Sequence, residues 1–312
     1  MDDPKMEQYF FTSSDDTIIN AYRWKPEGPP KALIHLSHGM GEHAARYDWT
    51  ARKLTESGYL VTANDHRGHG KTAEVLGDFG ENGWALMVSD LSELIKSNAE
   101  DYPDIPVVLF GHSMGSMLGE HFVTQFAEDI DILVLSGSPG FSPSLLGWIS
   151  RQLCRFENWR LGPRKESALL NFLIFGASNK NFKTEGDTGF EWLTREASEV
   201  KQYIEDPLCG FVPFPASLRS MFEGVKHMQD KNSIRCIPKS LPIYLFSGSA
   251  DPVHGEMANI NRLLAAWKNQ GLEIETCFYE DGRHEMLNET NKEEVIQSVV
   301  DWLALKIIGI KK

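Results

Sequence analysis

Short apolar runs alternate with amphipathic segments along the first 140 residues. Four runs have the pattern of buried strands, each followed by polar residues or glycines: 32–36, 59–63, 107–110 and 132–135. Helical spacing occurs over residues 46–57, which Gly58 ends, and over residues 84–99. This alternation predicts a mostly parallel sheet with helices on both faces.

The pattern is different at the start of the chain and in its middle. Residues 8–24 predict two strands joined by a turn at 13–16. Residues 140–235 contain no clear buried strand. The alternation resumes with strands at 243–246 and 274–279 and helices at 256–269 and about 292–305.

We therefore expect an α/β fold with a central sheet of about eight strands. Residues 1–139 and 236–312 would form its core, and residues 140–235 would be a mainly helical cap inserted into it. The cap would lie over the carboxyl ends of the strands, where open α/β sheets bind their ligands.

Composition narrows the classes of function. The formal net charge of −13 argues against nucleic acid as a partner and against a general affinity for anionic membranes. The N-terminal residues lack a signal-peptide pattern and no stretch is apolar enough to span a bilayer, so a cytoplasmic location is expected. The four cysteines are widely scattered, and neither a metal site nor a cofactor is predicted.

The strand at 107–110 leads into Gly111-His112-Ser113-Met114-Gly115, which fits the pattern G-x-S-x-G. A strand that turns sharply into a helix lifts the serine side chain above the sheet, and the two glycines leave room for neighbouring backbone. Ser113 is therefore the predicted nucleophile.

Polar residues also follow the strands at 243–246 and 274–279. A serine hydroxyl needs a base to take its proton, and the base needs an orienting carboxylate. Asp251 and His284 lie just past these strand ends, at the sheet edge where Ser113 is expected. We predict a triad of Ser113, Asp251 and His284, with His254 and Asp281 as the nearest alternatives.

A tetrahedral intermediate also needs two backbone donors for its oxyanion. One is expected to be the N–H of Met114, directly after the nucleophile. The other is expected to be the N–H of Met40, in the loop His38-Gly39-Met40-Gly41 after the strand at 32–36.

These motifs resemble the α/β-hydrolase superfamily and, within it, the monoacylglycerol lipase, lysophospholipase and serine aminopeptidase-like group. The similar stretches are HGMGEH with Arg46 and Tyr47 at 38–47, DHRGHG at 65–70, GHSMG at 111–115 and GRHE with Leu287 to Glu289 at 282–289. Within residues 140–235, FEWLTR at 190–195 and DPLCG at 206–210 are similar to bacterial members.

The resemblance implies the triad and oxyanion hole named above, with a cap over the site. It also implies that Glu42 and Arg46 lie near the end of the pocket that meets a polar headgroup, although a Glu–Arg pair at this spacing can also be structural. Mammalian monoacylglycerol lipases carry a further histidine three residues past the catalytic one, where this chain has Leu287. Contacts specific to glycerol are therefore not carried over.

One stretch of the cap is amphipathic. Leu145, Ile149, Leu153 and Phe156 repeat at nearly helical spacing, near Trp148 and Trp159 and among Arg151, Arg155, Arg160, Arg164 and Lys165. The helix could admit an acyl chain and make transient contact with a membrane or micelle. Alternatively, its apolar face could pack on the core and its basic face could be solvated.

We expect a cofactor-independent serine hydrolase that cleaves carboxylic esters of lipid-like substrates, such as a monoacylglycerol or a lysophospholipid. A serine aminopeptidase is an alternative, in which a cap carboxylate would hold the substrate amine. The candidates for that role are Glu157, Glu166, Glu185, Glu191 and Glu196. A third possibility is a small-molecule receptor or scaffold on the same fold with little turnover.

Overall fold

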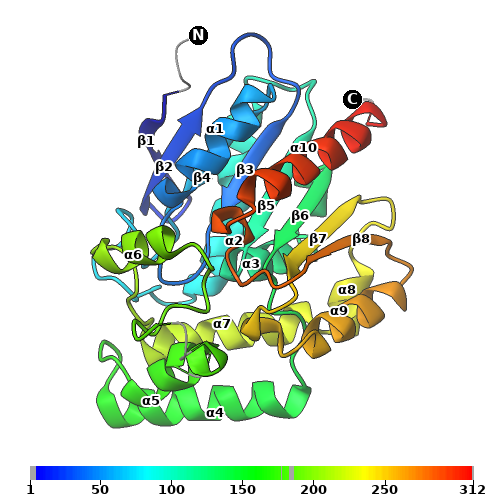
Figure 1. Cartoon of the computed structure of the whole chain (residues 1–312). Helices are drawn as coiled ribbons and strands as arrows, with labels where there is room; N and C mark the ends of the chain where they lie inside the picture. The colour runs from blue at the N-terminus through cyan, green and yellow to red at the C-terminus, as the bar shows by residue number, and fades with distance from the viewer. Residues whose placement is uncertain (1–4, 177, 183–185, 311–312) are drawn as a thin grey trace.

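The computed structural model describes residues 5–176, 178–182 and 186–310 (Figure 1). Within these residues, eight strands form one sheet in the order β1-β2-β4-β3-β5-β6-β7-β8. The strands are β1 (Glu7–Thr12), β2 (Ile18–Trp24), β3 (Leu33–Ser37), β4 (Leu60–Asn64), β5 (Val107–His112), β6 (Ile132–Ser136), β7 (Ile243–Gly248) and β8 (Ile274–Tyr279). Strand β2 pairs antiparallel with β1 and β4, and the pairings from β4 to β8 are parallel. The α/β fold class predicted from the sequence is confirmed.

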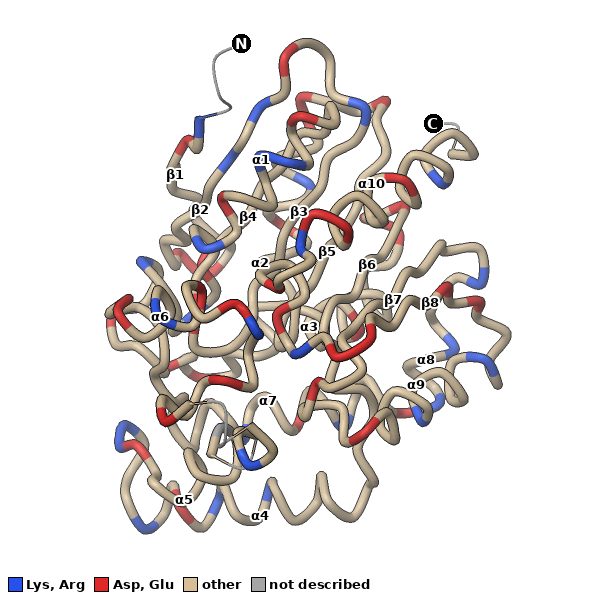
Figure 2. Tube along the Cα trace, in the orientation of Figure 1, with Lys and Arg blue, Asp and Glu red and all other residues tan. Residues whose placement is uncertain are grey.

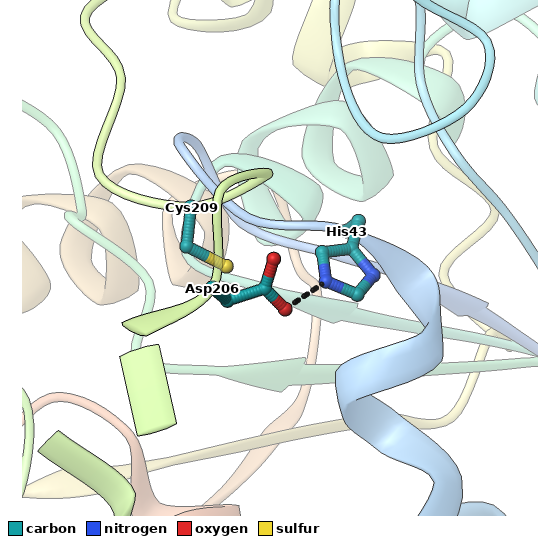
Figure 3. A group of neighbouring side chains, drawn as sticks. All are labelled: His43, Asp206 and Cys209. Atoms are coloured by element: carbon teal, nitrogen blue, oxygen red, sulfur yellow. Dashed lines mark hydrogen bonds and ion pairs between the residues drawn. The ribbon is translucent and has the colours of Figure 1, made fainter. Parts of the chain in front are cut away.

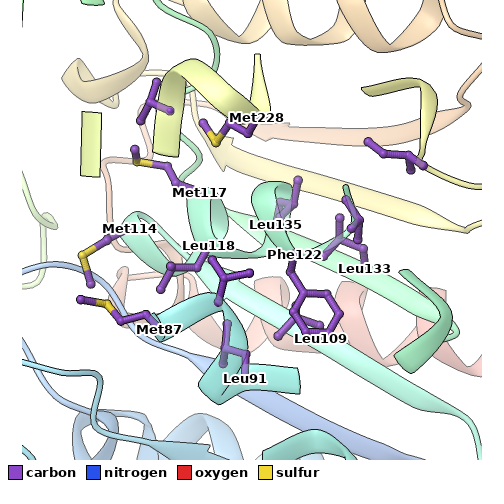
Figure 4. Close-up of a cluster of buried hydrophobic side chains, with 14 of the residues drawn as sticks. Met87, Leu91, Leu109, Met114, Met117, Leu118, Phe122, Leu133, Leu135 and Met228 are labelled. Atoms are coloured by element: carbon purple, nitrogen blue, oxygen red, sulfur yellow. The ribbon is translucent and has the colours of Figure 1, made fainter. Parts of the chain in front are cut away.

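The central strands are continuous apolar runs because helices cover both faces of the sheet. Successive side chains of a strand enter opposite cores. In β5, for example, Leu109 belongs to one buried cluster and Val108 and Phe110 belong to the other. Figure 4 shows the first cluster, where Leu118 and Phe122 of the helix after β5 lie near Leu109 and Leu133 of the sheet.

The helices of the core form one layer on each face. Helices α1 (Asp48–Glu56) and α10 (Lys292–Ile308) contribute to one buried cluster and lie together on the near side of the sheet in Figure 1. The other cluster contains residues of α2 (Gly83–Ala99), α3 (Met114–Phe122) and α9 (Ala258–Lys268).

The chain between β6 and β7 forms helices in place of strands in its described part. These helices are α4 (Ser144–Leu161), α5 (Ala168–Asn171), α6 (Ala197–Glu205), α7 (Pro215–Met228) and α8 (Lys231–Arg235). Figure 1 shows α4, α5 and α7 at the end of the sheet away from both chain termini. Helix α7 packs on α2 and α3, and α4 packs on α7.

This stacking explains the surface of α4. Because α7 already covers the core helices, α4 buries only a narrow strip around Cys154, while Leu145, Ile149 and Phe156 are exposed. Leu153 of the same stretch does pack against the core, so the alternative in which the apolar face packs on the core holds only in part. Figure 2 shows Lys and Arg positions along α4 and the chain that follows it. Two arginines of this region are ion-paired: Arg155 with Glu223 of α7 at 3.3 Å, and Arg164 with Asp78 at 2.7 Å.

No helix in the described part of the chain is long and apolar enough to cross a membrane.

Candidate active site

Ser113 stands at a strained turn between β5 and α3. Its backbone has φ 53° and ψ −114°, a conformation that is costly for a residue with a side chain. The flanking glycines leave no room for a side chain. A Cβ on Gly111 would lie 2.3 Å from the carbonyl oxygen of Gly115, and a Cβ on Gly115 would lie 1.9 Å from the carbonyl oxygen of Ser37. The Ser116 hydroxyl braces the turn by donating to the carbonyl oxygens of Gly111 and Ser136.

The three residues of the predicted triad lie in one hydrogen-bonded line. His284 Nε2 is 2.8 Å from Ser113 Oγ, and His284 Nδ1 is 2.8 Å from Asp251 Oδ2. Asp251 also accepts the N–H of Val253 at 2.9 Å and the hydroxyl of Ser247 at 3.2 Å, which fixes its carboxylate. This is the geometry that a serine nucleophile, its base and an orienting acid need.

The alternative residues lie elsewhere. The ring of His254 is buried within its own loop, where it contacts the carbonyl oxygen of Gly248 at 3.0 Å and accepts the N–H of Met257 at 2.9 Å. Asp281 is exposed in the turn after β8. Neither residue contacts Ser113.

The charges around His284 favour a basic imidazole. Burial by itself lowers its pKa, but Asp251, Glu285 and Glu42 raise the pKa above the ordinary value. Burial raises the pKa of Asp251, but His284 lowers it more, so the acid stays ionised. His112, whose ring centroid lies 4.9 Å from that of His284, has its pKa lowered to about 4 by burial and by His284. His112 is therefore neutral at neutral pH and does not oppose a charged His284.

The two predicted oxyanion donors belong to segments that meet at the cavity of the nucleophile. Met114 is the first residue of α3, where backbone N–H groups have no partner within the helix. Met40 lies in the loop after β3, and both residues line the same cavity as Ser113.

Glu42 and Arg46 form a buried ion pair on the loop after β3. Arg46 donates to Glu42, and it also donates to both carboxylate oxygens of Glu285, at 2.9 and 2.8 Å. Glu42 and Glu285 both line the cavity, beside Tyr203. The guanidinium of Arg46 lies 4.8 Å from the centre of the Tyr203 ring.

Three residues of this site were not predicted from the sequence: Trp192, Tyr203 and Glu285. Trp192 lies against the ring of His284, and its backbone carbonyl accepts the N–H of His284 at 3.4 Å. The similar stretches at 190–195 and 282–289 contain Trp192 and Glu285 but give no indication of their partners. Leu287, at the position of the extra histidine in mammalian monoacylglycerol lipases, is buried in the core.

The cavity at Ser113 has a volume of about 340 Å³. Its polar lining residues include Ser113, His284, Glu42, Glu285, Ser142 and Asn259, and the rest of the wall is mainly apolar. Most of the apolar wall comes from the chain between β6 and β7: Leu146, Leu173, Ile174, Trp192, Leu193, Met221, Phe222 and Val225. A long apolar group attached to a reactive carbonyl fits this division.

The carboxylates considered for binding a substrate amine do not line the cavity in the described part of the chain. Glu157 is buried against Arg160 and Ser167, and Glu191 is hydrogen-bonded by Thr188 and Asn179. Glu196 accepts the N–H of Ser198 at the start of α6, and Glu166 is exposed. Glu185 lies outside the described residues.

One group of described side chains has the donor types of a metal site: His43, Asp206 and Cys209 (Figure 3). Their donor atoms lie within 4.8 Å of one another, and His43 Nε2 is 2.8 Å from Asp206 Oδ2. Burial raises the pKa of the Cys209 thiol, which keeps it protonated and makes it a poor metal ligand. The His43–Asp206 contact joins the loop after β3 to the chain after α6.

The chain matches the family described as serine aminopeptidase, S33, over residues 28–291. It is 32% identical to the monoglyceride lipase of Mus musculus over 253 residues, which are 80% of this chain and 74% of the mouse protein. It is 26% identical to the monoacylglycerol lipase of Mycolicibacterium smegmatis over 90% of each chain.

The fold is also similar to solved structures. A thermostable carboxyl esterase from Bacillus coagulans, solved in complex with glycerol, superposes with a TM-score of 0.88 and 26% identity. The similarity covers 97% of this chain and 99% of the esterase.

Proposed function

Because the chain belongs to the S33 serine aminopeptidase family of α/β-hydrolases and is a carboxylic ester hydrolase, we propose that it acts through an acyl-enzyme at Ser113. The observation that carries the proposal is the line of hydrogen bonds from Ser113 through His284 to Asp251, with both contacts at 2.8 Å.

The reaction has two halves. Ser113 Oγ attacks the ester carbonyl while His284 Nε2 takes its proton, and the backbone N–H groups of Met40 and Met114 stabilise the resulting oxyanion. His284 returns the proton to the leaving alcohol as the C–O bond breaks. A water molecule then attacks the acyl-enzyme, with His284 as base again, and releases the acid and the free serine. Asp251 stabilises the charged imidazole in both halves.

The proposed substrate is a lipid-like monoester, such as a monoacylglycerol or a lysophospholipid. The mainly apolar wall of the cavity supports an acyl chain on the side of residues 140–235, with the leaving group on the side of Glu42 and Glu285. The names of the mouse and mycobacterial relatives support the same class of substrate.

We further propose that residues 140–235 are a cap on a core made of residues 1–139 and 236–312, and that the cap makes transient contact with lipid surfaces. Exposed large apolar side chains gather in α4 and the chain that follows it. They are Leu145, Leu146, Trp148, Ile149, Phe156, Trp159, Leu169, Phe172 and Leu173. Two of them, Leu146 and Leu173, also line the cavity, so this surface continues into the proposed acyl site.

The first experiment is labelling with a fluorophosphonate probe, with the label located by mass spectrometry and Ser113→Ala as control. Parallel assays use p-nitrophenyl esters of increasing chain length, a 1-monoacylglycerol and an aminoacyl-anilide. Labelling of Ser113 with turnover of medium or long esters is the expected result. Turnover of the anilide alone would indicate the peptidase, and saturable binding of a small molecule with negligible hydrolysis would indicate the receptor.

A further inference from the structure

Arg46 lies between two loops that carry proposed active-site groups. One loop follows β3 and contains Met40 and Glu42, and the other follows β8 and contains His284 and Glu285. The guanidinium donates to Glu42 on the first loop and to both carboxylate oxygens of Glu285 on the second, 239 residues further along the chain. The side chains of Arg46, Glu42 and Glu285 are only 10%, 4% and 6% exposed, so water screens these contacts little.

On the first loop, Glu42 holds the backbone directly before Met40. Its Oε1 accepts the N–H of Gly39 at 2.6 Å and the hydroxyl of Tyr47 at 2.8 Å. The loop is packed closely against the nucleophile, because a Cβ on Gly39 would lie 3.2 Å from the Cβ of Ser113 and 2.6 Å from Glu42 Oε1. A shift of Glu42 would therefore move the backbone that presents the proposed oxyanion donor.

On the second loop, Glu285 follows His284 directly. Its Oε2 accepts from Asn288 as well as from Arg46, each at 2.8 Å, and its N–H donates to the carbonyl oxygen of Leu193 at 2.7 Å. Burial by itself raises the pKa of Glu285, but Arg46 lowers it to about 2, so the ion pair persists at neutral pH. A bidentate pair between a guanidinium and a carboxylate fixes direction as well as distance.

We propose that Arg46 is a positioning residue that, through Glu42 and Glu285, sets the oxyanion loop and the loop of His284 in register with each other. This inference rests on the proposed function and gives the two carboxylates a role within the protein. Each of their oxygens already accepts a hydrogen bond from Gly39, Tyr47, Arg46 or Asn288.

The arrangement also has an electrostatic effect on His284. Asp251, Glu285 and Glu42 raise the pKa of its imidazole, His112 lies beside it, and Arg46 is paired with two of these three carboxylates. Removing the charge of Glu285 leaves Arg46 less neutralised, and both changes lower the pKa of His284.

The deciding variant is Glu285→Gln, which keeps the shape of the side chain and its acceptor oxygen. We expect the acidic limb of kcat/KM for a soluble p-nitrophenyl ester to move to lower pH by about 0.5–1 unit. The matched control is Glu289→Gln. Glu289 is a buried carboxylate of the same loop that binds Arg195 and the N–H of Arg283 and does not contact Arg46. In this control variant, the acidic limb of the kcat/KM profile should lie at the same pH as in the unmodified protein.

A second variant, Arg46→Lys, keeps the charge and loses the forked hydrogen bonds. We expect kcat to fall by about 10–100-fold while KM changes by less than about threefold. The affinity for an alkylboronic acid, which forms a tetrahedral adduct on serine, should fall in parallel with kcat/KM.

The outcomes separate this inference from the proposed function. If the unmodified protein hydrolyses esters and is labelled at Ser113, but Glu285→Gln leaves the pH limb in place or shifts it no more than Glu289→Gln does, the positioning role is wrong. If the unmodified protein is neither labelled nor active, the proposed function itself fails. Should Arg46→Lys not fold, the pH profile of Glu285→Gln still decides.

Discussion

The indole ring of Trp192 lies against the imidazole of His284, with ring centroids 5.1 Å apart. The carbonyl oxygens of Trp192 and Leu193 accept the N–H groups of His284 and Glu285. The chain between β6 and β7 therefore contacts the proposed catalytic base through both a side chain and the backbone. Removal of this contact should affect the reaction even with substrates too small to reach the rest of residues 140–235.

Trp192→Leu is expected to lower kcat/KM for p-nitrophenyl acetate by about tenfold, because the ring supports the imidazole and the face of an indole stabilises a cation by about 0.5–2 kcal/mol. Steady-state kinetics at the pH optimum measure the effect. Trp159→Leu is the control, since Trp159 is 80% exposed on α4 and lies outside the cavity. Equal losses in the two variants would contradict a specific role for Trp192.

Glu120→Gln is expected to stabilise the protein at neutral pH. Burial raises the pKa of Glu120 to about 8, and its Oε1 accepts the hydroxyl of Ser138. Below the unfolded pKa near 4.5 the carboxyl is protonated in both states, and its contribution to stability is fully present. As the pH rises towards 8 the unfolded chain loses this proton and the folded chain keeps it, so that contribution is lost. At pH 7 the glutamine variant should gain about 2–3 kcal/mol in the free energy of unfolding.

Urea titrations of the Glu120 variant at pH 5 and pH 8 provide the measurement. The stabilisation should be much larger at pH 8 than at pH 5. A variant that is less stable than the original protein at both values would show that the carboxyl is ionised and well paired in the folded state.

Mild acid should destabilise the folded state of this protein. Burial lowers the pKa of His35, His38 and His112 to about 4 and that of His69 to about 3. Between about pH 6.5 and pH 4 the unfolded chain binds protons at these sites and the folded chain does not, so stability falls as the pH falls. Each such histidine lowers the free energy of unfolding by up to about 1.4 kcal/mol for each unit by which the pH falls in that window. Glu120 has the opposite effect on stability, but the histidines together outweigh it.

The free energy of unfolding measured at pH 7 and pH 5.5 tests this expectation. The free energy of unfolding should be several kcal/mol lower at pH 5.5 than at pH 7. An unchanged value would mean that the buried histidines take up protons in the folded state.

The exposed apolar surface of α4 should matter only when substrate is presented in a lipid surface. The double variant Trp148→Ser, Trp159→Ser removes two side chains that are 54% and 80% exposed. Hydrolysis of a monoacylglycerol in neutral phosphatidylcholine vesicles is expected to fall about tenfold, because about 1–2 kcal/mol of interfacial binding is lost, while turnover of a soluble ester stays unchanged.

Phe10→Ser is the matched control for this surface. Phe10 is 68% exposed on β1, which Figure 1 shows at the other end of the molecule from α4. Its vesicle activity should equal that of the original protein. Parallel losses on vesicles and on soluble ester in the α4 variant would argue against contact with lipid.

The sequence alone determined the core of the fold and the positions of the candidate triad. Apolar runs identified the buried strands because those strands are covered on both faces. Ser113, Asp251 and His284 could be placed because parallel strands end at the same sheet edge, so residues just past their ends must come together. The sharp turn at Ser113 is equally local, since Gly111 and Gly115 are the residues that its backbone contacts require.

Only the tertiary structure decided which distant side chains are partners. Nothing in the pattern near Arg46 indicates Glu285, and nothing near His284 indicates Trp192, because these pairs form only when separate loops are packed against one another. The exposure of the apolar side chains of α4 is also decided by tertiary packing. Its apolar spacing predicts a helix with an apolar face, but whether that face is covered depends on α7 already occupying the surface of the core.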